Sequence, residues 1–85
     1  MLIKVLDEEG NLSSASNVDL ATVVRLYNAH SAAVVITRKT SGGTTIGSLS
    51  VGTLDTVLLE KDASDTLTAA SQGSNMKVVK IAYGN

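Results

Sequence analysis

The sequence contains no cysteine, no proline, no tryptophan and no phenylalanine, and it has two tyrosines and one histidine. Without cysteine the chain forms neither a disulfide nor a thiolate metal site, so cysteine usage does not indicate a redox compartment. Without tryptophan, phenylalanine or proline, aromatic recognition grooves and proline-rich ligand segments are excluded. The core must therefore be built from valine, leucine, isoleucine and alanine, which suit a thin layer between two sheets.

An excess of positive charge and a long apolar run are also missing. Seven lysines and arginines stand against eight acidic residues, for a formal net charge of -1, so the chain has no general attraction to a nucleic-acid backbone. No apolar run approaches the roughly 20 residues that span a bilayer, and Met1–Leu6 is too short for the core of a signal peptide. We expect a protein that binds neither nucleic acid nor membrane and that is not exported by a classical leader.

The length of 85 residues predicts a single domain over residues 1–85, because a division would leave two cores too small to fold. A chain this short buries only about 60 to 65% of the surface that its unfolded form exposes. Its margin of stability should be thin. Self-association or docking on a larger body would therefore add to its stability.

The middle of the chain holds three apolar, β-branched runs separated by two turn signals. Ala33–Arg38 and Thr44–Val51 are rich in valine, isoleucine and threonine, which favour a pleated strand over a helix. The glycines of Ser41–Gly43 allow the positive φ that a tight hairpin turn needs. Gly52 marks a second reversal before the third run, Leu54–Leu59. This pattern predicts an antiparallel meander.

Two details of these runs predict local irregularities. Ile46 and Leu49 have opposite parity in the return strand, so the intervening Gly47 predicts a bulge that turns both side chains inward. The consecutive apolar residues at 57–59 predict that the third run is covered on both faces.

The segment Val18–Asn28 fits two periods. Apolar residues recur there at a helical spacing, and Asn17 could cap such a helix. Alternation fits the second half as well, and we favour a strand from about Thr22 to Asn28 because the next residues suit a short connection. That strand would pair with Ala33–Thr37 and extend the meander.

The predicted first and last strands, Met1–Leu6 and Met76–Tyr83, each carry lysine but are otherwise apolar. We expect Leu2–Leu6 and Met76–Ala82 to form sheet edges that another chain could complete. One face of the last strand is expected to carry Val79, Ile81 and Tyr83.

Two polar stretches separate the strands. Asp7–Asp19 is predicted to be a loop in which residues 7–17 exchange their amide protons quickly. In Asp62–Asn75, Leu67 alone is strongly apolar and is expected to plug one end of the core. Ser64 or Asp65 could cap a single helical turn there.

The count of short, regularly spaced strands gives the fold class. We predict an all-β chain, an antiparallel β-sandwich or small barrel of six to seven short strands, immunoglobulin-like or jelly-roll-like.

The residues predict no catalytic site. His30 is the single histidine and has no cysteine or second histidine to complete a zinc site, so we interpret it as a surface residue. Gly42 and Gly43 lack the spacing and the lysine of a phosphate-binding loop and are interpreted as a turn. We therefore expect no enzyme and no cofactor.

Two groups of oxygen side chains are candidates for a cation site. Asp7, Glu9 and Asn11 alternate as in the start of a calcium loop, but the twelfth position is Val18 where an EF-hand needs a glutamate. The second group could gather near one end of a sandwich, although solvated charges are the favoured interpretation. It comprises Asp55, Glu60, Asp62 and Asp65.

Three segments resemble small structural proteins of tailed bacteriophages, especially marine and cyanobacterial ones. They are the VRLYN run at Val24–Asn28, the GTTIGSLSV run at Gly43–Val51 and the LLEKDASDTL run at Leu58–Leu67. The resemblance implies a virion protein present in many copies, which decorates or cements a capsid or serves at the neck or tail. It also implies assembly with itself and with other virion proteins, in the host cytoplasm and then in the virion. Residues 1–19 match no such pattern.

The alternative is a small binding module made during infection, with a sugar, a cation or a host protein as its ligand. A sugar site usually presents aromatic faces, and Tyr27 and Tyr83 are the two candidates. The residue types thus leave both a structural role and a binding role open.

Overall fold

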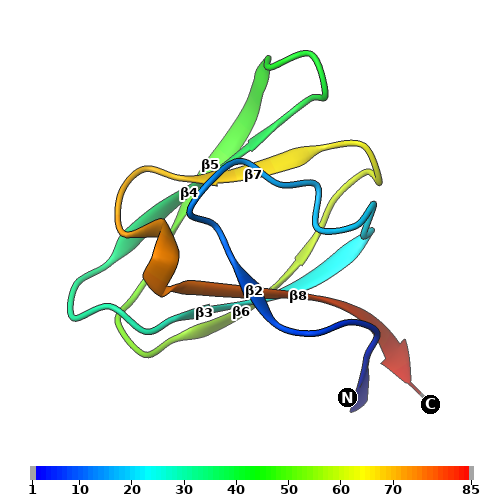
Figure 1. Cartoon of the computed structure of the whole chain (residues 1–85), viewed down its shortest axis with the longest axis horizontal. Coiled ribbons are helices and arrows are strands. Elements are labelled where there is room, and N and C mark those ends of the chain that lie inside the picture. Colours follow the sequence, from blue (N-terminus) through cyan, green and yellow to red (C-terminus); the bar gives the residue numbers. More distant parts are fainter. Residues whose placement is uncertain (1, 85) are drawn as a thin grey trace.

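The computed structural model describes residues 2–84 and consists of two antiparallel β-sheets that pack face to face (Figure 1). Met1, which the predicted first strand included, lies outside the described residues. The elements are β1 (Leu2–Val5), β2 (Gly10–Asn11), β3 (Val23–Asn28), β4 (Val34–Lys39), β5 (Thr45–Val51), β6 (Thr56–Glu60), β7 (Thr66–Ala69), the 3-10 turn η1 (Gly73–Asn75) and β8 (Met76–Gly84).

The larger sheet has the order β1-β8-β3-β6, with β2 also paired to β8, and the smaller sheet has the order β5-β4-β7. The predicted all-β sandwich is confirmed, with more strands than the six to seven expected. The two strands that no predicted run covers are the short β2 and β7.

Strand β3 settles the ambiguous segment in favour of a strand. Val24, Leu26 and Asn28 are fully buried, while the residues between them are half-buried. This alternation has the period of a strand with one face on the core. Residues 18–20 form a turn before β3, in which Val18, Asp19 and Leu20 all have positive φ.

The predicted meander is correct for one pair of strands and wrong for the others. β4 pairs with β5 along its length, as expected. However, β3 pairs with β6 and β8, and not with β4, so residues 29–33 carry the chain from one sheet to the other. Residues 52–55 carry it back, because β6 also belongs to the larger sheet. Each connection crosses the roughly 10 Å between packed sheets, which a few extended residues can span.

Three further expectations need correction. β6 is not covered on both faces: it is an edge strand in which exposed and half-buried residues alternate, and Leu58 is 40% exposed. β8 is not an edge, because β1 and β2 lie on one side of it and β3 on the other. Neither Ser64 nor Asp65 caps a helical turn, since residues 62–65 form a tight turn that leads into β7.

The hairpin between β4 and β5 has the predicted irregularities. Gly43 has φ of 93°, and the Thr40 N–H donates to the Thr44 carbonyl oxygen at 2.8 Å. Further along, Arg38 faces Gly47 while Lys39 faces Thr45, so Ile46 is the additional residue of a bulge.

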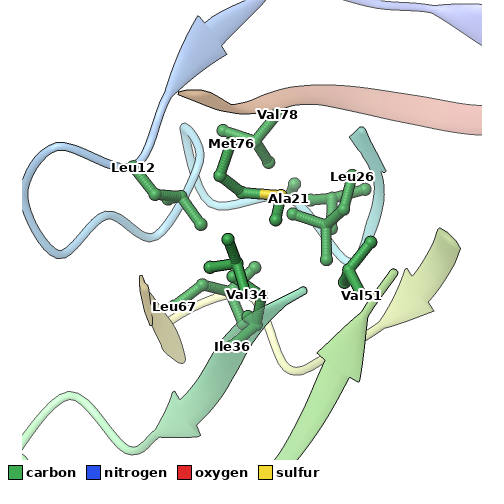
Figure 2. Close-up of a cluster of buried hydrophobic side chains, with 10 residues drawn as sticks. Leu12, Ala21, Leu26, Val34, Ile36, Val51, Leu67, Met76 and Val78 are labelled. Atoms are coloured by element: carbon green, nitrogen blue, oxygen red, sulfur yellow. The ribbon is translucent and has the colours of Figure 1, made fainter. Parts of the chain in front are cut away.

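The core is aliphatic, as the composition requires, and Figure 2 shows its side chains meeting between the two sheets. Leu67 is fully buried, in agreement with its predicted role. Leu12, in the polar stretch interpreted as loop, is also buried and closes the core on the η1 side, where its backbone N–H donates to Gly73 and Met76 carbonyls. The cluster comprises Leu12, Ala21, Val24, Leu26, Val34, Ile36, Val51, Leu67, Met76 and Val78.

Candidate functional site

Beyond Val23, the first residue of β3, the larger sheet narrows to two strands. β1 pairs with residues 81–84 of β8, whereas β3 pairs with β8 only as far as Lys80. We call these two segments the ribbon. In Figure 1 the ribbon lies at one corner of the molecule, away from the smaller sheet.

The ribbon carries large apolar side chains in water. Leu2 is 69% exposed, Val5 63% and Tyr83 46%, and Leu6, directly after β1, is 50% exposed. A two-stranded β-ribbon is at best marginally stable in water without further cover. The outer edge of β1 pairs with no other strand of residues 2–84. The ribbon is therefore a candidate docking surface with both apolar side chains and free backbone groups.

A second exposed feature is a hollow of about 190 Å³ on the opposite side of the sandwich. Its walls come from β4, β5 and the edge strand β6, so neither the larger nor the smaller sheet forms it alone. Ile46, in the bulge, and Leu49 both line it. The expectation that the bulge turns both side chains inward is wrong for Ile46, which is 47% exposed at the rim of the hollow, and holds only in part for the half-buried Leu49. The full lining is Ile36, Arg38, Ile46, Gly47, Ser48, Leu49 and Leu59.

A buried polar cluster lies next to this hollow, around the turn after β6. The Arg38 guanidinium contacts the Asp65 carboxylate at 2.6 and 2.7 Å, and Asp65 Oδ2 also accepts the Asp62 N–H at 3.2 Å. Lys61 is 3% exposed and donates from Nζ to the carbonyl oxygens of Asp62 and Ala63. Burial lowers the pKa of Lys61; Asp65 opposes this effect and Arg38 adds to it.

The predicted gathering of four carboxylates at one end of the sandwich occurs for two of them only. Asp62 and Asp65 do lie together, but Arg38 and Lys61 balance their charge. Asp55 precedes β6 and Glu60 ends it, so they lie at opposite ends of that strand. Within residues 2–84, no group of three acidic, histidine or cysteine side chains is placed to hold a metal ion.

The oxygen side chains of Asp7, Glu9 and Asn11 do not converge either. Asp7 accepts the N–H of Glu8, and Asn11 accepts the N–H of Ser13. Glu9 forms an ion pair with Arg25 at 3.1 Å. The alternating residues of this stretch thus cap local turns or tie the loop to β3, and they form no common cage.

Asn28 is the second buried polar centre. Its side chain is fully buried, and Nδ2 donates to the Ala32 and Val51 carbonyl oxygens at 2.9 Å each. Oδ1 accepts the His30 N–H at 2.8 Å. These bonds join the end of β3 to the end of β5. His30 is half-buried in this connection, and its carbonyl oxygen accepts a hydrogen bond from the Thr53 hydroxyl.

The two tyrosines do not form one sugar-binding face. Tyr27 lies beside Arg25, whose guanidinium carbon is 5.7 Å from the ring centre, and pairs with Lys77 in β8. Tyr83 is six residues further along β8, about 20 Å away at the rise of a strand. A single sugar ring could not contact both side chains.

No family model, curated protein or solved structure matches this chain significantly. Among residues 2–84, no helix is long and apolar enough to cross a membrane.

Proposed function

We propose that this chain is a non-enzymatic structural protein that works by assembly, and that it is a component of a phage virion. In that setting it would serve as a capsid decoration protein or as an accessory protein of the neck or tail. Its partners would be copies of itself and other virion proteins. It would therefore act in the host cytoplasm during assembly and then in the virion.

The observation that carries the assembly role is the ribbon. Leu2, Val5 and Tyr83 expose apolar surface on two strands that have no sheet beside them on the β1 side. Docking would bury these side chains and pair the free backbone groups of β1, and both changes favour association. Lys4 blunts the edge in part, because a strand that adds to β1 must also accommodate its charge.

The phage setting rests on the resemblance at residues 24–28, 43–51 and 58–67. In the structure, residues 24–28 belong to β3, and residues 43–51 comprise the end of the hairpin turn and β5. Residues 58–67 comprise the end of β6, the following turn and the start of β7. Mass spectrometry of purified particles tests this setting, because a virion component is present in a fixed copy number.

Sedimentation at micromolar concentration tests the assembly role. We expect the wild-type chain to associate and the double variant Leu2→Asp, Val5→Asp to be monomeric, because one charge would then lie on each face of the ribbon. Leu54→Asp is the matched control, since Leu54 is 66% exposed in the turn between β5 and β6 and far from the ribbon.

A second assay tests docking on a larger shell, with the same variants and purified capsids. Capture of the wild-type chain and of Leu54→Asp, but not of the ribbon variant, would support the proposal. A strict monomer that binds no part of the particle would contradict it, and an infected-cell binding module would then be the better description.

A further inference from the structure

One side of the sandwich is left open between β5 and β6. β5 pairs only with β4, and β6 pairs only with β3. The side at β7 is different, because Ser16 and Leu67 exchange backbone hydrogen bonds of 3.1 and 2.8 Å along the outer edge of β7. The described chain thus protects the edge at β7 and leaves the edge at β5 unprotected.

The edge at β5 also lacks the usual devices against strand addition. The chain has 15 charged residues (seven basic and eight acidic), yet none occurs from Ser41 to Leu54. Natural edge strands are normally blunted by lysine, by proline or by a covering segment. β1 has Lys4 and β6 has Glu60, whereas β5 has serine, threonine and glycine between its apolar residues. Among residues 2–84, no segment other than β4 hydrogen-bonds to the backbone of residues 45–50.

The hollow described above lies directly beside this edge. Its volume of about 190 Å³ is somewhat larger than the roughly 150 Å³ of an engineered apolar cavity that binds benzene. It therefore has room for one large apolar side chain and not for a drug-sized ligand. Arg38, the charged residue of the lining, is already bound to Asp65 at 2.6 Å, so it offers little to an anionic group.

We propose that the β5 edge accepts a strand from a partner protein, an extended and uncharged segment whose central large apolar side chain enters the hollow. The backbone of this segment would pair with β5, which is the usual basis of recognition by strand addition. Its alternate side chains would face Ile46, Leu49 and Leu59. This surface is separate from the ribbon and does not depend on the assembly role proposed above.

A single segment fits this position better than a strand that is already part of a sheet. Leu59 of β6 bounds the far side of the hollow, so an added strand must run between β5 and β6. A second copy would bring its own β4 and β6 with its β5. The peptide is therefore the occupant that we propose, and pairing with a second copy is an alternative that the test separates.

The test uses the full chain and a synthetic, terminally blocked nonapeptide that alternates threonine and valine and has phenylalanine at its centre. We expect millimolar peptide to shift the amide resonances of residues 45–50 and the methyl resonances of Ile46, Leu49 and Leu59. The same peptide with N-methyl groups on alternate residues should bind at least about tenfold more weakly, because it cannot donate to β5. A central alanine in place of phenylalanine should also weaken binding.

Two single substitutions in the smaller sheet test whether the peptide binds at the β5 edge. Ile46→Lys should abolish the shifts, since it places a charge in the hollow, whereas Val35→Lys should leave them unchanged. Val35 is a fair control because it is 41% exposed and Ile46 is 47% exposed, and Val35 lies on the other face of the smaller sheet. Dispersed amide spectra would show that both variants are folded. The ribbon variant should bind the peptide as the wild type does, whether or not it associates with itself.

Several results would overturn the proposal. The first is that β5 resonances do not move, and the second is that the N-methylated peptide binds equally well, which would indicate apolar adhesion alone. Shifts in β5 that depend on protein concentration and need no peptide would show that a second copy is the occupant. Shifts confined to the ribbon would leave the assembly surface intact and remove the proposal for β5.

Discussion

Replacement of Asn28 should be among the most damaging changes in this protein. The side chain is fully buried and makes three hydrogen bonds, to Ala32, Val51 and His30. Each such bond contributes a net 0.5 to 1.5 kcal/mol, about 1 on average, and a buried group left without a partner costs about 1 to 3 kcal/mol. For Asn28→Ala we therefore expect a loss of about 3 to 5 kcal/mol in the free energy of unfolding.

That loss is large for a domain of this size. Stabilities of roughly 0.05 to 0.15 kcal/mol per residue correspond to about 4 to 13 kcal/mol for 85 residues. If the wild type lies at the lower end of this range, Asn28→Ala should unfold a substantial fraction of the molecules in the absence of denaturant; if it lies higher, the variant should stay folded with a lower urea midpoint. Urea unfolding followed by circular dichroism measures the change, and the slope should stay the same if the unfolded state is unaffected.

Two variants separate the hydrogen bonds from simple loss of volume. Asn28→Asp keeps the shape and the acceptor for the His30 N–H but removes both donors and buries a charge, so at neutral pH it should be at least as damaging as alanine. Asn11→Ala is the control, because Asn11 is exposed and makes a single bond, to the Ser13 N–H at 3.1 Å. A loss below about 1 kcal/mol for Asn28→Ala would refute the assignment of Asn28 as a structural centre.

Asp65→Asn should cost about 3 to 5 kcal/mol, because it leaves the half-buried Arg38 and the buried Lys61 without their counter-charge. Asp62→Asn, at an 85% exposed side chain, should cost less than about 1 kcal/mol. Burial lowers the pKa of Lys61 in the folded chain, so between that pKa and the ordinary lysine value the unfolded chain binds more protons than the folded chain. The free energy of unfolding should therefore rise with pH across this window. Urea titrations at several pH values should show this rise for the wild type and not for Lys61→Met. Gly43→Val should lower the free energy of unfolding by about 1 kcal/mol or more, because Gly43 has φ of 93°. Gly47→Val, where φ is not positive, should lower it by less in the same urea assay. Equal costs would place the turn constraint elsewhere.

The positions of most strands could be predicted because they depend on local properties. Val34–Lys39 and Thr45–Val51 are β-branched and bounded by glycine, and the positive φ at Gly43 and the bulge at Ile46 follow from glycines in the sequence. β7 was not predicted, since Leu67 is its single strongly apolar residue. Its place in the sheet depends on Leu67 entering the core, which is a tertiary contact.

The strand pairing could not be predicted, because the same apolar pattern suits a neighbour in one sheet or a neighbour across the core. β3 and β4 are separated by five residues, enough for a hairpin within one sheet and also for a crossing between sheets. The crossing is fixed by Asn28, whose side chain binds carbonyl groups in the connection and at the end of β5. The hollow could not be predicted either, because its walls come from β4 and β5 in one sheet and β6 in the other, and this arrangement depends on the strand pairing. The absence of charged residues from Ser41 to Leu54 is evident in the sequence.

The two buried polar centres lie near opposite ends of the sandwich. Asn28 ends β3, while Lys61 donates its backbone N–H to Thr22, the residue before β3. Between these points the sheets are held by aliphatic contacts, which specify position less sharply than directional bonds do. Asn28 therefore fixes the end of β3 against the end of β5 in the other sheet, and the Arg38–Asp65 pair fixes the turn after β6 against β4. The ribbon and the β5 edge both lie outside the aliphatic cluster, so a partner could dock at either one while the core stays closed.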